Sequence, residues 1–152
     1  KPLVISTGTK FDWRSSTYYN NLIKKIKSNK LNNFRILGRV SREEQLYLIM
    51  NAKYLINPSK SEGWNSAIEE AKSLNTKVLA SNLEVHREQL GSQGIYFDRH
   101  NYQKLSKILQ KSMINKKKIT SYNYTRLYKI NSINFRKFAN VYKNIINTVI
   151  ND

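Results

Sequence analysis

One stretch decides the fold: Pro58-Ser59-Lys60-Ser61-Glu62-Gly63-Trp64-Asn65-Ser66-Ala67-Ile68-Glu69-Glu70-Ala71. The apolar run before it predicts a strand that ends at Asn57 and Pro58, because proline cannot continue a central strand. Apolar residues then recur at helical spacing and predict an inward-packing helix: Ala67, Ile68, Ala71 and Leu74. Strand, polar loop and helix place Glu62 beside the first backbone N–H groups of the helix. These groups and the helix dipole favour an anion, so the stretch predicts an acid next to an anion site.

Further strands and helices alternate on both sides of this stretch. A capping box, Ser41 with Glu44 three residues on, predicts the start of one helix. Five strands are expected, the first of them of the buried type: Leu3–Ser6, Phe34–Leu37, Lys53–Asn57, Lys77–Ser81 and Gly94–Asp98. The last helix is expected over residues 134–150. This alternation predicts an α/β fold, a doubly wound, Rossmann-like parallel sheet with helices on both faces, in a single domain over residues 1–152.

Polar and glycine-containing segments follow the predicted strands. Because ligands of such folds sit beyond the carboxyl ends of the strands, we expect these segments to share one edge. They are Gly8, Gly38-Arg39-Val40, Pro58–Glu62 and the polar segment Asn82–Gln89 after Ser81.

The composition narrows the class of protein without deciding it. The chain has 152 residues, no cysteine, and no apolar run near the roughly 20 residues that span a bilayer. Its net charge is +17, and residues 101–152 hold eleven Lys and Arg against one acid, which gives +10. Such a surface suits anionic lipid, nucleic acid or anionic small molecules, while the abundance of Lys, Asn, Ile and Tyr also fits coding bias. No recognition motif for nucleic acid accompanies the charge.

Few residues suit catalysis. Glu62 fits either a catalytic role or simple capping of the helix, and Glu70, eight positions on, lies roughly on the same side. Glu69 is expected to be solvated. His86 is expected to be a hydrogen-bonded structural residue. With two histidines and no cysteine, no metal site is predicted.

The motifs, in their order along the chain, resemble the family-four retaining glycosyltransferases of the two-Rossmann (GT-B) architecture. The family's donor-site signature is a glutamate, seven residues and a second glutamate, which Glu62 and Glu70 match. The segments Ile36–Leu46, Ser81–Gln89 and Tyr96–Asp98 resemble its flanking segments. The resemblance covers about residues 3–112, and the helix over residues 134–150 suits the family's closing helix.

The resemblance implies a role for each matching position. Glu62 would face the donor sugar and the reacting centre, and Glu70 would hold the ribose hydroxyls. The donor would also meet a set of backbone and loop positions: Gly8, Gly38, Arg39, Val40, Gly63, Trp64, Asn65 and Ser66. The substrate would be a UDP-, GDP- or dTDP-sugar, with no cofactor and no bound metal in the catalytic step.

Two departures from the family pattern stand out. Asn65 replaces a second glycine that many members have in this loop. The family's first strand and helix, and the acceptor-binding domain before them, have no counterpart here, so we expect a donor-binding domain that is inactive alone. The parent enzyme would act at the cytoplasmic face of the membrane in polysaccharide, lipopolysaccharide or glycoconjugate synthesis, with a lipid-linked or glycan acceptor and a peripheral contact with anionic membrane.

Two other functions remain open from the sequence. One is a nucleotide-sugar epimerase of the same architecture, which would need more acids and histidines around the sugar than Glu62 and His86. The other is a non-catalytic basic module that binds membrane or nucleic acid, for which Glu62 would be dispensable.

Overall fold

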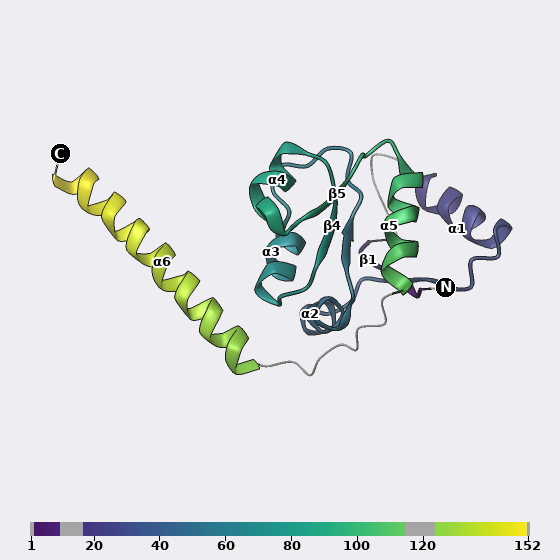
Figure 1. The fold of residues 1–152 in the computed structure, drawn as a ribbon. Helices are drawn as coiled ribbons and strands as arrows, with labels where there is room; N and C mark the ends of the chain where they lie inside the picture. The colour runs from purple at the N-terminus through teal and green to yellow at the C-terminus, as the bar shows by residue number, and fades with distance from the viewer. Residues whose placement is uncertain (1, 10–16, 115–123, 152) are drawn as a thin grey trace.

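The computed structural model describes residues 2–9, 17–114 and 124–151. Helices and strands alternate along most of the chain, as predicted, in an α/β fold (Figure 1). The strands are β1 (Val4–Thr7), β2 (Phe34–Gly38), β3 (Leu55–Asn57), β4 (Val78–Ser81) and β5 (Ile95–Phe97). The helices are α1 (Tyr18–Ser28), α2 (Arg42–Asn51), α3 (Ser66–Ser73), α4 (Glu84–Leu90), the 3₁₀ turn η1 (Gly91–Gln93), α5 (Tyr102–Ile114) and α6 (Tyr124–Asn151).

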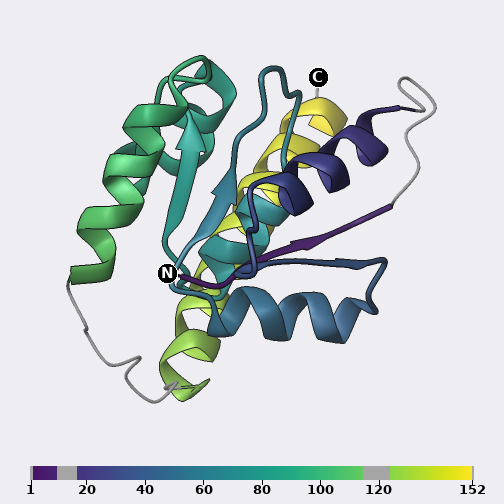
Figure 2. The same ribbon diagram turned by 90° about the vertical axis from the view of Figure 1, so that its right-hand side faces the viewer.

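All the described strand pairs are parallel, but they form two sheets where we expected one. β1 pairs with β2, and β3, β4 and β5 pair in that order. Figure 2 shows that the strands of the two sheets run in clearly different directions. No strand of one sheet therefore pairs with a strand of the other. The connection from β2 to β3 through α2 passes from one sheet to the other.

The hydrophobic core belongs to the three-stranded sheet. All four residues of β4 are buried, and α3 packs against the sheet through Ile68 and Ala71, as the helical spacing predicted. Helices α3 and α4 lie on one side of this sheet and α5 on the other, which is the doubly wound arrangement (Figure 1). The core residues are Ile49, Ile68, Ala71, Val78, Leu79, Ala80, Leu90 and Phe97.

The first strand is not of the buried type that we expected. Residues of β1 alternate between half-buried and exposed, and Ile5 keeps 41% of its surface exposed. Helix α1, the next element, buries none of its residues. The apolar run was correctly assigned to a strand, but no layer covers both of its faces.

Three other local predictions can be compared with the structure. The capping box is confirmed: Ser41 Oγ accepts from Glu44 N–H at 3.2 Å, and Ser41 N–H donates to Glu44 Oε2 at 2.7 Å. Helix α4 covers most of the polar segment Asn82–Gln89, where we did not predict a helix. The last helix begins ten residues before the predicted position 134, at Tyr124.

Among the described residues, no helix is both long and apolar enough to cross a membrane.

Candidate functional site

The loop between β3 and α3 is built around the carboxylate of Glu62. Glu62 Oε2 accepts hydrogen bonds from Ser59 Oγ and Asn65 Nδ2, each at 2.9 Å. The hydrogen bond from Asn65 lowers the pKa of the Glu62 carboxyl, and Ser59, Asn57 and the nearby His86 act in the same direction. Partial burial opposes them, but the net shift is downward. Glu62 is therefore held as a carboxylate at neutral pH.

Asn65 connects this carboxylate to the helix. Its side chain caps α3, because Asn65 Oδ1 accepts from Ile68 N–H at 3.1 Å while Nδ2 donates to Glu62. The N–H groups of Ser66 and Ala67 point out of the same helix end, since helix geometry gives them no intrahelical acceptor. The structure thus confirms that Glu62 precedes the N-terminus of a helix, the setting in which an anion is stabilised.

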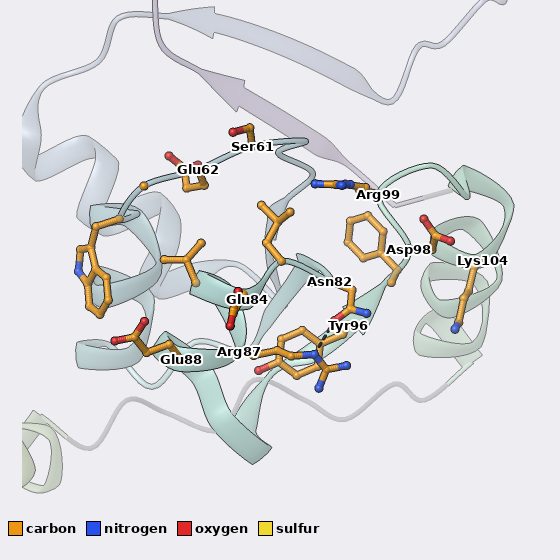
Figure 3. Close-up of a pocket in the computed structure, with 15 residues that line it drawn as sticks. Ser61, Glu62, Asn82, Glu84, Arg87, Glu88, Tyr96, Asp98, Arg99 and Lys104 are labelled. Atoms are coloured by element: carbon orange, nitrogen blue, oxygen red, sulfur yellow. Dashed lines mark hydrogen bonds between the residues drawn. The ribbon is translucent and has the colours of Figure 1, made fainter.

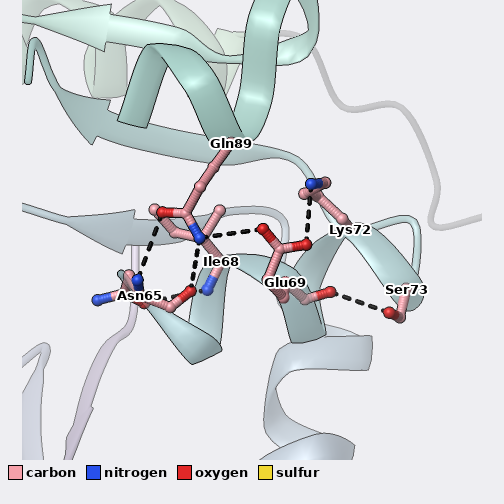
Figure 4. Close-up of polar contacts among 6 residues, drawn as sticks. All are labelled: Asn65, Ile68, Glu69, Lys72, Ser73 and Gln89. Carbon is pink, nitrogen blue, oxygen red and sulfur yellow. Dashed lines mark hydrogen bonds and ion pairs between the residues drawn. The ribbon is translucent and has the colours of Figure 1, made fainter. Parts of the chain in front are cut away.

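Gln89 of α4 holds the start of α3 from the other side (Figure 4). Its Nε2 donates to Asn65 O and to Glu69 Oε1, both at 3.0 Å, and Asn65 N–H donates to Gln89 Oε1 at 3.4 Å. Glu69 also pairs with Lys72 Nζ at 2.9 Å. Glu69 keeps 37% of its side chain exposed, as expected of a solvated acid, but it also has these two partners, which we did not predict. Gln89 was missed because the polar segment Asn82–Gln89 was not predicted to be a helix.

His86 has the structural role that the sequence favoured. The ring is fully buried, and Nδ1 donates to Ser81 O at 2.8 Å. Ser81 Oγ in turn donates to Ser59 O at 2.5 Å. This chain of contacts ties the ends of β3 and β4 together behind Glu62.

A cleft of about 1040 Å³ opens beside the loop, between Glu62 and helix α4 (Figure 3). Gly63 and Trp64 line it, and Trp64 keeps 58% of its surface exposed. Figure 3 shows Ser61 and Glu62 across the cleft from Arg87 and Glu88. The volume is at the upper end of what small-molecule sites have, so the cleft can accept a ligand as large as a nucleotide-sugar.

The cleft carries charges of both signs. The acids Glu84, Glu88 and Asp98 lie with the bases Arg87, Arg99 and Lys104. Arg87 is fixed: its guanidinium lies 4.8 Å from the ring centroid of Tyr96, and its Nε donates to Asn82 Oδ1 at 2.6 Å. Carboxylates can accept hydrogen bonds from sugar hydroxyls, and guanidinium groups can bind phosphate.

Glu70 lies outside the residues that line this cleft. Its carboxylate forms an ion pair with Arg42 Nη1 and accepts from Gln45 Nε2 at 2.9 Å, so it joins α3 to α2. Only 12% of its side chain is exposed. Glu62 and Glu70 therefore lie in different surroundings, and Arg42 and Gln45 are partners that the spacing of the two glutamates did not indicate.

The remaining predicted positions lie at the end of the two-stranded sheet. Gly8 N–H donates to Gly38 O at 2.9 Å, and both glycines have positive φ, +122° and +80°, where a side chain would be strained. Arg39 is exposed, and Val40 lines a small apolar hollow with Leu37 and Tyr47. The predicted residues therefore form two groups, one at the end of each sheet, and do not share one continuous edge.

No metal site is evident in the described ranges 2–9, 17–114 and 124–151, where no three His, Asp or Glu side chains gather closely enough to hold an ion.

A comparison with known families assigns the chain to a class. The family described as glycosyl transferases group 1 matches residues 5–126. The chain belongs to this family. A comparison with curated proteins gives no match.

Proposed function

We propose that the chain is the nucleotide-sugar-binding domain of a retaining glycosyltransferase of the GT-B architecture. The observation that carries the proposal is the carboxylate of Glu62, held ionised by Asn65 and Ser59 between the N-terminus of α3 and a ligand-sized cleft. Family membership supports the transferase activity. The donor would be a UDP-, GDP- or dTDP-sugar.

In this proposal the sugar lies against Glu62 and the diphosphate at the start of α3. The bond between the anomeric carbon and the phosphate oxygen breaks, and a bond from the acceptor hydroxyl oxygen forms on the same face of the sugar, while the proton of that hydroxyl passes to the leaving phosphate oxygen. Positive charge that develops on the sugar ring faces the Glu62 carboxylate. Negative charge on the leaving diphosphate faces the N–H groups of Ser66 and Ala67, where the helix dipole stabilises it.

Glu70 would bind the ribose of the nucleotide. Because Arg42 and Gln45 already hold its carboxylate, ribose hydroxyls would share or replace these partners. Gly8 and Gly38 would lie nearer the base, with Arg39 and Val40 at its border. The acceptor would be bound by a second domain, and the enzyme would act on a glycan or lipid-linked acceptor at the cytoplasmic face of the membrane.

Two alternatives have less support. An epimerase would use histidine beside the sugar, but His86 is fully buried and engaged with Ser81. A purely basic binding module would not need the set of hydrogen bonds that keeps Glu62 ionised.

The proposal is tested by replacing Glu62 with glutamine in the full-length protein. Loss of the carboxylate removes charge stabilisation at the reacting centre, so Glu62→Gln is expected to lower kcat at least about 100-fold. The exposed Glu43 of α2 offers a matched control, because Glu43→Gln makes the same chemical change away from the cleft. Sugar transfer from labelled donor would be measured for both variants. Equal rates for Glu62→Gln and Glu43→Gln would overturn the proposal.

A further inference from the structure

Arg87 of helix α4 is held in a fixed position on the wall of the cleft opposite Glu62 (Figure 3). Its Nε donates to Asn82 Oδ1 at 2.6 Å, and its guanidinium lies 4.8 Å from the ring centroid of Tyr96. Stacking on the ring fixes the plane of the guanidinium, and the hydrogen bond from Nε fixes its rotation within that plane. The two Nη groups of Arg87 are therefore held in one orientation.

The ring under Arg87 is also held in place. The Tyr96 hydroxyl donates to Gly91 O at 2.7 Å. Gly94 makes room for the ring, because a Cβ atom at this position would lie 2.5 Å from Tyr96 Cζ and 3.0 Å from Leu90 Cβ. A larger residue at position 94 would push the ring aside. The position of Arg87 thus depends on a glycine and an aromatic residue that the proposed reaction does not otherwise use.

The positive charge of Arg87 has no counter-ion within residues 2–9, 17–114 and 124–151, because both ion pairs found there involve acids of α3. Glu84 and Glu88 belong to the same helix as Arg87 and line the same cleft, but neither forms an ion pair with it. The Nη groups also have no hydrogen-bond partner in the described part of the chain. A fixed arginine with two free Nη groups is suited to bind a carboxylate or a phosphate of a ligand through two parallel hydrogen bonds.

The neighbouring side chains indicate what kind of ligand carries this oxyanion. The carboxylates of Glu84 and Glu88 repel a small free anion, but they accept hydrogen bonds from hydroxyl groups. Trp64 adds an aromatic wall that is 58% exposed. The cleft volume of about 1040 Å³ also exceeds what a single inorganic anion fills. A saccharide that carries hydroxyl groups and one oxyanion fits all of these features.

This cleft lies away from the residues proposed to bind the nucleotide. Helix α3 contacts α2 on one side and α4 on the other (Figure 1). Glu70 faces α2 through its ion pair with Arg42, whereas the cleft is lined by residues of α4. Neither Glu70 nor Ser66 lines the cleft. Arg87 is therefore not placed to bind the diphosphate at the start of α3, and its ligand lies beyond Glu62 on the α4 side.

We propose that Arg87 binds the carboxylate or phosphate of an acidic saccharide held in this cleft. The assignment to a saccharide rests on the proposed function, which places a sugar at Glu62. The acidic group belongs to the donor sugar or to the acceptor, and the chemistry at Arg87 is the same in both cases. Arg87 thereby selects acidic over neutral sugars.

The first test is an NMR titration of the isotopically labelled full chain with glucose, glucuronate, glucose 6-phosphate and inorganic phosphate. At least one of the two acidic sugars is expected to bind at least about tenfold more tightly than glucose or phosphate. Arg87→Gln is expected to reduce this affinity to within about threefold of that for glucose. Arg136→Gln makes the same chemical change on the exposed surface of α6 and is expected to leave the affinity unchanged.

Two further variants separate the orientation of Arg87 from its charge. Arg87→Lys keeps the charge and loses the fork of N–H groups, and Asn82→Ala keeps all charges and removes the acceptor that holds Nε. Each is expected to weaken binding of the acidic sugar at least about threefold and to leave binding of glucose unchanged. Both side chains are exposed, so the urea unfolding midpoint is expected to stay the same.

Competition identifies the source of the acidic group. The glucose ester of the nucleotide that binds most tightly, which is UDP-glucose, GDP-glucose, ADP-glucose or dTDP-glucose, is added at saturation. Displacement of the acidic sugar assigns the oxyanion to the donor sugar. Simultaneous binding of both assigns it to the acceptor.

Four results would overturn the inference. The first is that neither acidic sugar binds more tightly than glucose, and the second is that inorganic phosphate binds as tightly as the acidic sugars. The third is equal affinity of Arg87→Gln and Arg136→Gln for the acidic sugar, and the fourth is unchanged binding by both Arg87→Lys and Asn82→Ala. If nucleotides still bind in a manner that depends on Glu70, any of these results leaves the proposed function standing. Absence of nucleotide binding would instead count against the proposed function itself.

Discussion

The two sheets differ in how well they are covered. In the three-stranded sheet, β4 is buried along its whole length and α3 and α4 both bury residues against the core. In the two-stranded sheet, β1 and β2 alternate between half-buried and exposed positions up to the buried Gly38, and α1 has no buried residue. Stability is therefore concentrated in the part of the chain that carries Glu62.

The predicted site residues therefore fall into two groups, one around Glu62 in the well-packed sheet and one around Gly8 and Gly38 in the less covered sheet. Glu62, Asn65 and Gln89 are joined by hydrogen bonds, and Gln89 is buried. Gly8, directly after β1, and Gly38, the last residue of β2, are joined to one another, but both strands have exposed faces. A rigid scaffold suits the reacting centre, where small displacements are costly, and a looser one is tolerable where the base of a nucleotide binds.

The largest expected effect contrasts one residue from each sheet. Leu79 of β4 is fully buried, so Leu79→Ala is expected to lower the free energy of unfolding by about 3 kcal/mol. Ile5 of β1 is 41% exposed, so Ile5→Ala is expected to lower it by less than about 1 kcal/mol. Urea denaturation measures both. Equal losses of unfolding free energy would show that the two sheets are equally well packed, and would contradict the difference described above.

A smaller effect is expected at Asn65, where two substitutions separate its two roles. Asn65→Ala removes the cap of α3 and is expected to lower the free energy of unfolding by about 1 kcal/mol. Asn65→Ser keeps a capping oxygen without adding charge beside Glu62, so stability is expected to change by less than about 0.5 kcal/mol. It also removes the amide donor to Glu62 and is expected to reduce sugar transfer as strongly as Asn65→Ala. Normal transfer by Asn65→Ser would show that this donor is not needed.

The smallest effect is on the dependence of stability on pH. The folded state lowers the pKa of Glu62 below its ordinary value of 4.5, so its contribution to stability is present above that pH. The contribution is lost as the pH falls through the lowered pKa. Glu62→Gln is therefore expected to flatten the acid side of the stability curve below about pH 4.5, measured by urea unfolding at a series of pH values. Identical acid slopes for the two proteins would contradict the pKa shift.

Much of the fold could be predicted because local patterns were strong. The helix after Asn65 and the capping box at Ser41 have clear periodicity and capping residues, and the structure confirms both. The strand patterns alone did not predict two sheets, because they do not specify which edges pair. The seven-residue helix α4 was missed because its residues are mostly polar, although His86, Gln89 and Leu90 are buried.

The candidate site was also predictable only where local sequence patterns determine it. The position of Glu62 before a helix follows from sequence order alone, and the structure confirms it. The partners of Glu70 do not follow, because Arg42 and Gln45 lie on another helix, 28 and 25 residues earlier in the chain. Contacts between side chains of two different helices can be identified only when the packing of the helices is known.

Calorimetric titration of the chain with UDP, GDP, ADP and dTDP tests the central claim most directly. We predict saturable binding of at least one of these nucleotides, weakened at least about tenfold by Glu70→Ala, through loss of hydrogen bonds to the ribose, and unchanged by Lys24→Ala on the exposed surface of α1. No binding of any of the four, or equal affinities for the two variants, would contradict the account of the loop from Pro58 to Ser66 and helix α3 as a nucleotide-sugar site.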